Sequence, residues 1–97
     1  MSNLAECPII SPMPRQTLKW GDYNEIIVYV KNTAAFKCSV IGPWIGLAHS
    51  RDGNKIRIYG EIPLKEDSAD KRDNGMIEVK AFNEAGEDNI EVHFDII

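Results

Sequence analysis

Two histidines are the residues of this chain whose types first suggest catalysis. A hydrolytic triad needs a nucleophile, a base and an orienting acid within hydrogen-bond reach of one another. His49 is followed by Ser50 and Asp52, but residues this close in an extended segment point away from each other. His93 falls on the outward phase of an alternating segment, which is typical of a solvated strand residue. We therefore expect no catalytic residues and no enzyme.

Metal ligation is the second chemistry that the residue types suggest. The sequence contains neither C-x-x-C nor H-E-x-x-H, so zinc has no ligand set. Four carboxylates that could hold calcium lie in one polar loop at 65–75, at Glu66, Asp67, Asp70 and Asp73. Their spacing lacks the alternating order of a dedicated calcium loop, and lysine and arginine lie among them, which favours a solvated, self-neutralised loop. We expect no metal and no cofactor.

The two cysteines, Cys7 and Cys38, exclude the disulfide framework of a small secreted protein. Thiols in a protein made in the cytosol are normally reduced, and cysteine also serves as a small buried hydrophobe. The alternative is a single bridge between them, which requires that both lie on facing strands.

The segments that carry these residues show a hydrophobic period of two. Alternating segments occupy 25–30, 36–41, 55–59, 76–82 and 89–96, and 8–12 fits an edge strand protected by its prolines. Phe36, Cys38, Val40, Val79 and Phe94 fall on inward phases. Turn residues connect the segments, and no window has a helical stripe. We predict an all-β, two-layer antiparallel β-sandwich of about seven strands over 8–97, preceded by an N-terminal arm at 1–7.

Composition narrows the possible partners. The chain has 97 residues, 43% of them hydrophobic, and a net charge of −4, as in ordinary soluble globular domains. Its longest basic run is the pair Lys71-Arg72, so nucleic acid is not an expected partner. No apolar run approaches the ~20 residues that cross a bilayer, and the N-terminus lacks the pattern of a signal peptide. We expect no membrane contact and synthesis in a host cytoplasm.

The order of short motifs resembles the immunoglobulin-like module found in bacterial surface proteins and phage structural proteins. The matching pieces are 42–47 (GPWIGL), 52–63 (DGNKIRIYGEIP) and Gly75 followed by 77–86 (IEVKAFNEAG), within about residues 8–97. The chain departs from the family at Pro43-Trp44-Ile45, where small residues are usual, and in its charged 65–75 loop. The resemblance implies an immunoglobulin-like sandwich with a structural or adhesive role, and it brings no catalytic residues.

From a single module of this kind without an export signal, we predict a bacteriophage virion accessory protein that binds a capsid or tail protein. The segment from Met1 to Pro14 is rich in proline and apolar residues and can lie extended along a partner. Its candidate binding residues are Leu4, Ile9, Ile10 and Met13.

Trp20 and Tyr23 extend this candidate partner-binding set at one end of the sandwich, although Trp20 alternatively forms a lid over the core. The alternative function is an adhesin module that binds host-surface glycans through Trp20, Tyr23 and the 65–75 loop. Trp44 is expected to pack between the sheets. A polar set with alternating charge is expected to be one solvated sheet surface, formed by Arg57, Tyr59, Glu78, Lys80, Glu91, His93 and Asp95.

Overall fold

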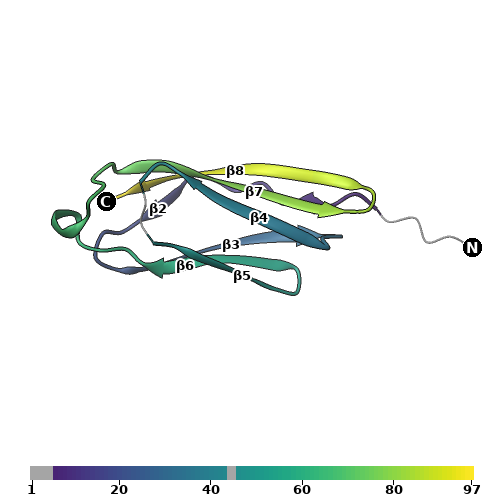
Figure 1. Ribbon diagram of the computed structural model, residues 1–97, viewed down its shortest axis with the longest axis horizontal. Coiled ribbons are helices and arrows are strands. Elements are labelled where there is room, and N and C mark those ends of the chain that lie inside the picture. The colour runs from purple at the N-terminus through teal and green to yellow at the C-terminus, as the bar shows by residue number, and fades with distance from the viewer. Residues whose placement is uncertain (1–5, 44–45) are drawn as a thin grey trace, which may run out of the picture.

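The alternating segments form strands in the computed structural model, which describes residues 6–43 and 46–97. Eight strands and one short 3-10 helix occupy these residues (Figure 1). Their bounds are β1 (Ile9–Ile10), β2 (Gln16–Leu18), β3 (Tyr23–Lys31), β4 (Ala35–Ile41), β5 (Ala48–Asp52), β6 (Lys55–Glu61), η1 (Lys65–Asp67), β7 (Asn74–Asn83) and β8 (Gly86–Ile96). None of the described segments is a helix long and apolar enough to cross a lipid bilayer.

The strands form two four-stranded sheets that pack face to face, with the order β1-β3-β6-β5 in one and β2-β8-β7-β4 in the other (Figure 1). The predicted all-β sandwich is therefore confirmed. One pairing departs from the otherwise antiparallel arrangement, because β2 pairs with β8 in the parallel direction, with Gln16 opposite Phe94. The first part of the chain thus pairs with both sheets, since β1 joins β3 and β2 joins β8.

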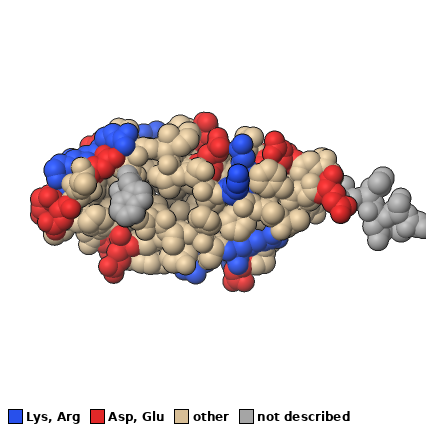
Figure 2. Space-filling model, viewed as in Figure 1, with Lys and Arg blue, Asp and Glu red and all other residues tan. Residues whose placement is uncertain are grey.

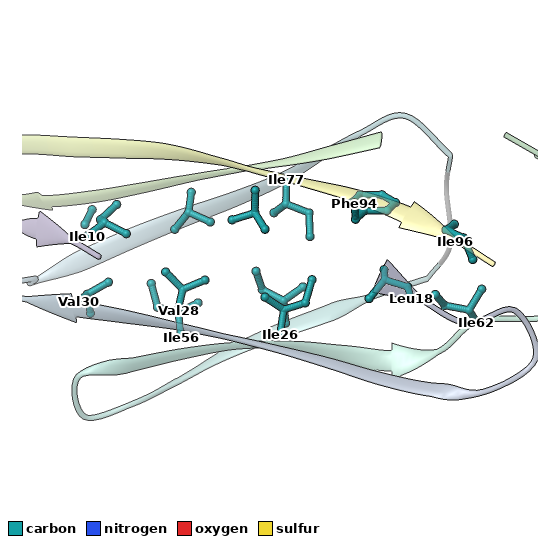
Figure 3. Close-up of a cluster of buried hydrophobic side chains, with 14 residues drawn as sticks. Ile10, Leu18, Ile26, Val28, Val30, Ile56, Ile62, Ile77, Phe94 and Ile96 are labelled. Atoms are coloured by element: carbon teal, nitrogen blue, oxygen red, sulfur yellow. The ribbon is translucent and has the colours of Figure 1, made fainter. Parts of the chain in front are cut away.

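The hydrophobic core lies between the two sheets and is built from the inward phases of the strands (Figure 3). Val79 and Phe94, both predicted to point inward, are completely buried. Ile56 and Val28 are buried to the same degree in the opposite sheet. Alternation with a period of two places every second side chain on one face, so each sheet contributes one apolar layer.

Two strands, β2 and β5, have no counterpart in the alternating pattern of the sequence. β2 buries only Leu18 among its three residues, and β5 is the polar segment from Ala48 to Asp52. Each is held by backbone pairing to a longer neighbour, β8 and β6 respectively. Backbone pairing requires no hydrophobic side chain, and such strands therefore leave little signal in the sequence.

Strands β4 and β5 are edges of opposite sheets, and a groove with a volume of about 300 Å³ lies between them. Phe36 and Cys38 point inward as predicted but are only partly buried, and Val40 is 39% exposed. The inward phase of β4 is therefore correct, while full burial is not reached because the sandwich is open at this edge. In the view of Figure 2, the surface is hollowed and largely uncharged along its middle.

Candidate binding surface

The outer face of β3 and β6 carries a group of aromatic and charged side chains that do not contribute to the hydrophobic core. Both strands alternate, so their buried isoleucines and valines force the intervening residues outward. The antiparallel register places Glu25 opposite Tyr59, Ile27 opposite Arg57, and Tyr29 opposite Lys55. We call this surface the tyrosine–arginine face, and it comprises Tyr23, Glu25, Ile27, Tyr29, Lys55, Arg57 and Tyr59.

Arg57 lies at the centre of a hydrogen-bond network on this face. Its guanidinium donates to the two carboxylate oxygens of Glu25 at 2.9 and 3.4 Å, and to the Tyr23 hydroxyl at 3.4 Å. The Tyr23 hydroxyl donates in turn to Glu25 at 2.9 Å. The Arg57 guanidinium also lies 4.6 Å from the centre of the Tyr59 ring. A two-point arginine–carboxylate pair combined with ring stacking holds these side chains in one arrangement.

The same network sets the ionisation of its members. Hydrogen bonds from Arg57 and then from Tyr23 hold the pKa of the Glu25 carboxyl below its ordinary value. The hydrogen bond to Glu25 raises the pKa of the Tyr23 phenol above its ordinary value. Because the folded-state pKa of Glu25 is lowered, its contribution to stability is present above its unfolded-state pKa and is lost as the pH falls through the folded value.

Large side chains on this face remain accessible to a partner. Tyr23 is 50% exposed, Tyr29 is 48% exposed, and the Lys55 ammonium lies 5.9 Å from the centre of the Tyr29 ring. Tyrosine and arginine are the residue types that most often carry the binding energy of protein interfaces, because they offer a large rigid area with a polar end. The face can therefore bind a protein surface or stack against a sugar ring.

Two of the six predicted binding residues lie on this side of the sandwich. Tyr23 belongs to the tyrosine–arginine face, and Ile9, which is 54% exposed, pairs with Lys31 beside it. Ile10 is 3% exposed because its side chain points into the core, so it is not available to a partner in this structure. Met13 and Trp20 are partly buried and pack against the core, as expected for Trp20 acting as a lid.

The predicted arm at 1–7 includes residues outside the described part of the chain, and the binding residue Leu4 is among them. The described residues Glu6 and Cys7 are hydrogen-bonded to the sandwich. The Asn83 side chain donates to the Glu6 carbonyl, and the Asn32 side chain donates to the Cys7 carbonyl at 3.4 Å. The sandwich therefore holds the chain from residue 6 onward. Trp44, predicted to pack between the sheets, also lies outside the described residues.

The predicted polar surface with alternating charge is divided between two sheets. Arg57 and Tyr59 lie on β6, whereas the remaining five residues lie on β7 and β8 in the opposite sheet. His93 points outward as expected, and its ring nitrogen lies 3.5 Å from Glu91. The alternation showed that these side chains point outward, but only the pairing of strands showed that they belong to opposite sides of the molecule.

Cys38 and His49 both line the groove between β4 and β5. A cysteine near a histidine is the residue pair of a cysteine nucleophile and its base. An activated cysteine needs a lowered pKa, because the thiolate is the nucleophile. Burial instead raises the pKa of the Cys38 thiol to about 11. The His49 ring packs edge-on against Phe36, with 5.6 Å between the ring centres. The groove therefore holds a protonated thiol and an aromatic contact between the two sheets.

Ellman's reagent at about pH 8 is expected to modify Cys7 at least ~10-fold faster than Cys38, because only about one Cys38 thiol in a thousand is ionised there. Both thiols are free, and Cys7 is exposed. The measurement is the release of the coloured thiol over time, compared with single Cys→Ser variants. In denaturant the two rates should converge. Equal rates in the folded protein would show that the Cys38 thiol is accessible.

The 65–75 loop is held by its own charged side chains. Lys71 donates to the carbonyls of Lys65, Glu66 and Ser68 at 3.0, 3.3 and 2.9 Å, and Arg72 forms an ion pair with Asp70 at 2.5 Å. Across 6–43 and 46–97, no three histidine, cysteine or acidic residues gather into a group that could hold a metal ion. The loop thus has an internal structure that includes η1, and its last two positions belong to β7.

Solved structures are similar in fold to this chain, although the sequence matches no family model and no curated protein. The titin M4 domain has a TM-score of 0.72 at 16% identity, over 98% of this chain and 100% of that domain. This chain has an immunoglobulin-like fold. The titin M7 domain gives a TM-score of 0.69 at 13% identity over 99% of each chain. The SrpA adhesin from Streptococcus sanguinis gives 0.73 at 19% identity, over all of this chain and 60% of the adhesin.

Proposed function

We propose that this chain is a non-enzymatic structural or adhesive module that binds a protein of a larger assembly through the tyrosine–arginine face. The observation that carries the proposal is the network centred on Arg57, which holds Tyr23, Glu25 and Tyr59 in place on an exposed sheet surface. Side chains that are already ordered lose less conformational entropy when a partner binds. This arrangement therefore favours a binding role over a catalytic one.

The non-enzymatic part of the proposal is supported by the two histidines. His49 contacts Phe36 in the groove, and His93 lies beside Glu91 on the outside of the opposite sheet. The thiol that shares the groove with His49 has a raised pKa, which is the opposite of what a nucleophile needs. These placements support a role in binding.

We further propose that the assembly is a bacteriophage particle, with a capsid or tail protein as the partner and the virion as the location. The support is the resemblance of the sequence to modules of phage structural proteins. The segment 1–7, with Leu4, is proposed as a second contact, because two contacts linked in one chain bind more tightly than either alone.

An adhesin that binds host-surface glycans is the second candidate. Exposed tyrosine rings can stack on sugar rings, and Tyr23 and Tyr29 are about half exposed. The adhesin from Streptococcus sanguinis, whose structure contains a region of the same fold, also favours this candidate. We place it second because Arg57 is engaged with Glu25 and Tyr59 in the pattern of a protein-binding centre.

Replacing Arg57 by alanine is expected to weaken binding to phage particles by about 2 kcal/mol or more, close to 30-fold, because it removes the residue that orders the face. The measurement is co-sedimentation of the purified chain with particles from a culture that produces it, over a range of chain concentrations.

The matched control is Arg15→Ala. Arg15 forms an exposed ion pair with Asp95 at 2.6 Å on the opposite sheet, so its loss should leave binding unchanged. If Arg57→Ala bound the particles as tightly as the unmodified chain, the tyrosine–arginine face would not be the binding surface. Binding of the unmodified chain to a glycan array, without binding to particles, would instead support the adhesin.

A further inference from the structure

The four edge strands of the sandwich differ in their protection against pairing with another chain. Strand β1 has two residues and lies between Pro8 and Pro12, and β2 has three residues after Pro14. Strand β5 ends in Arg51 and Asp52. Short length, prolines and charges are the devices by which proteins prevent the pairing of exposed edges.

Strand β4 has none of these devices except one lysine. Its seven residues, Ala35–Ile41, are all described and contain no proline, and Lys37 is the single charged residue. Val40 is 39% exposed and Ile41 is 52% exposed, and the open groove runs along the inner side of the strand. A seven-residue apolar edge of this kind is a template for an added strand.

The charges beside β4 indicate what that added strand is. Lys37 lies directly opposite Lys80 of β7, so two like charges face each other within one chain. Two residues further along β4, Ser39 lies opposite Glu78. The ion pair of Glu78 with Lys80 is weak, at 3.9 Å. A partner strand that placed a lysine next to Ser39 would therefore complement this edge.

We propose that two copies of this chain pair antiparallel along β4, around a twofold axis at Cys38, and join their β2-β8-β7-β4 sheets into one continuous sheet. In this register Phe36 of one copy lies opposite Val40 of the other, and both belong to the partly covered inward row. Lys37 of each copy lies opposite Ser39 of the other. The strand is therefore self-complementary in both its apolar and its polar rows.

The register creates the same charge row twice, once on each side of the twofold axis. Each row contains Glu78 and Ser39 of one copy, followed by Lys37 and Lys80 of the other. Lys37 and Glu78 then stand two strands apart, about 10 Å between backbones, and their long side chains can meet above the small Ser39. Pairing thus adds a second acidic neighbour for each Lys37, besides the Glu78 that lies diagonal to it in its own chain. The proposal is independent of the tyrosine–arginine face, which lies on the other sheet.

Sedimentation equilibrium from about 1 μM to about 1 mM tests the pairing. The unmodified chain should form a dimer, and Lys37→Glu and Glu78→Lys should each raise the dimer dissociation constant by about tenfold, because each places like charges in both rows. Mixing the two single variants should restore dimerisation, since a mixed pair has opposite charges in both rows.

Two further measurements separate loss of pairing from loss of folding. Lys37→Glu removes the like-charge pair with Lys80, so its monomer should melt at the same temperature as the unmodified chain or higher. Val40→Lys should abolish the dimer, whereas its control Leu64→Lys, at a residue that is 49% exposed away from β4, should not.

A chain that stays monomeric over this range overturns the proposal, including one whose β4 edge takes up an extended peptide instead. A dimer that resists Val40→Lys and Lys37→Glu, or that the mixed variants fail to restore, also overturns it, because the copies then meet at another surface.

Discussion

Replacing Phe94 by alanine is expected to lower the free energy of unfolding by about 3–5 kcal/mol. Among residues 6–43 and 46–97, Phe94 is the largest completely buried side chain, and it lies on β8, an inner strand of its sheet. Truncation removes most of the ring and leaves a cavity that the neighbouring strands cannot close without breaking their ladders. Domains of this size have a total stability of about 5–15 kcal/mol, so the loss is a large part of it. The measurement is the denaturant midpoint, followed by circular dichroism.

The control for Phe94→Ala is Ile97→Ala, one residue beyond the end of the same strand. Ile97 is 69% exposed, so its truncation should change the unfolding free energy by less than about 0.5 kcal/mol. A midpoint for Phe94→Ala close to that of the control would mean that the ring does not fill the core.

Replacing Gly75 by alanine is expected to cost about 1–3 kcal/mol, because the position has no room for a side chain. Gly75 lies opposite Phe94 in the β7–β8 ladder. A methyl group there would lie 2.8 Å from Cζ of Phe94, 3.0 Å from the Ile41 carbonyl oxygen and 3.0 Å from Cδ of Pro43. The ring of Phe94 thus packs over the strand that carries the glycine. Thermal unfolding followed by calorimetry measures the cost.

A double-variant cycle identifies which contact causes the cost at Gly75. Phe94→Leu replaces the ring by a shorter side chain. It should reduce the penalty of Gly75→Ala, because the closest contact is to the far end of the Phe94 ring. The penalty should not disappear, since the contact with the Ile41 carbonyl remains. Additive effects of the two substitutions would contradict direct packing of Phe94 over Gly75.

The sequence predicts the surface position of the candidate site residues but not how they come together. The outward phases of β3 and β6 identify Tyr23, Arg57 and Tyr59 as surface residues, and that signal was available in the sequence. Their assembly into one network depends on the register that sets Glu25 opposite Tyr59. A shift of one residue would have turned every side chain to the other face, and a shift of two that set Glu25 opposite Glu61 would have separated Arg57 from Glu25.

The amino-acid sequence is enough to predict the class of fold and the inward or outward direction of most side chains. Alternation in 25–30, 76–82 and 89–96 was enough, because a strand with one buried face must repeat with a period of two. Burial of Val79 and Phe94 follows directly from that pattern.

The choice of neighbouring strands could be seen in the three-dimensional structure but not in the sequence. The sequence did not reveal the short strands β2 and β5, the parallel pairing of β2 with β8, or the groove that leaves Val40 exposed. Nor did it separate Arg57 from Glu78, which lie on opposite sheets. Strands pair through backbone groups, which are the same in every residue except proline. The order of strands therefore leaves no periodic pattern in the side chains.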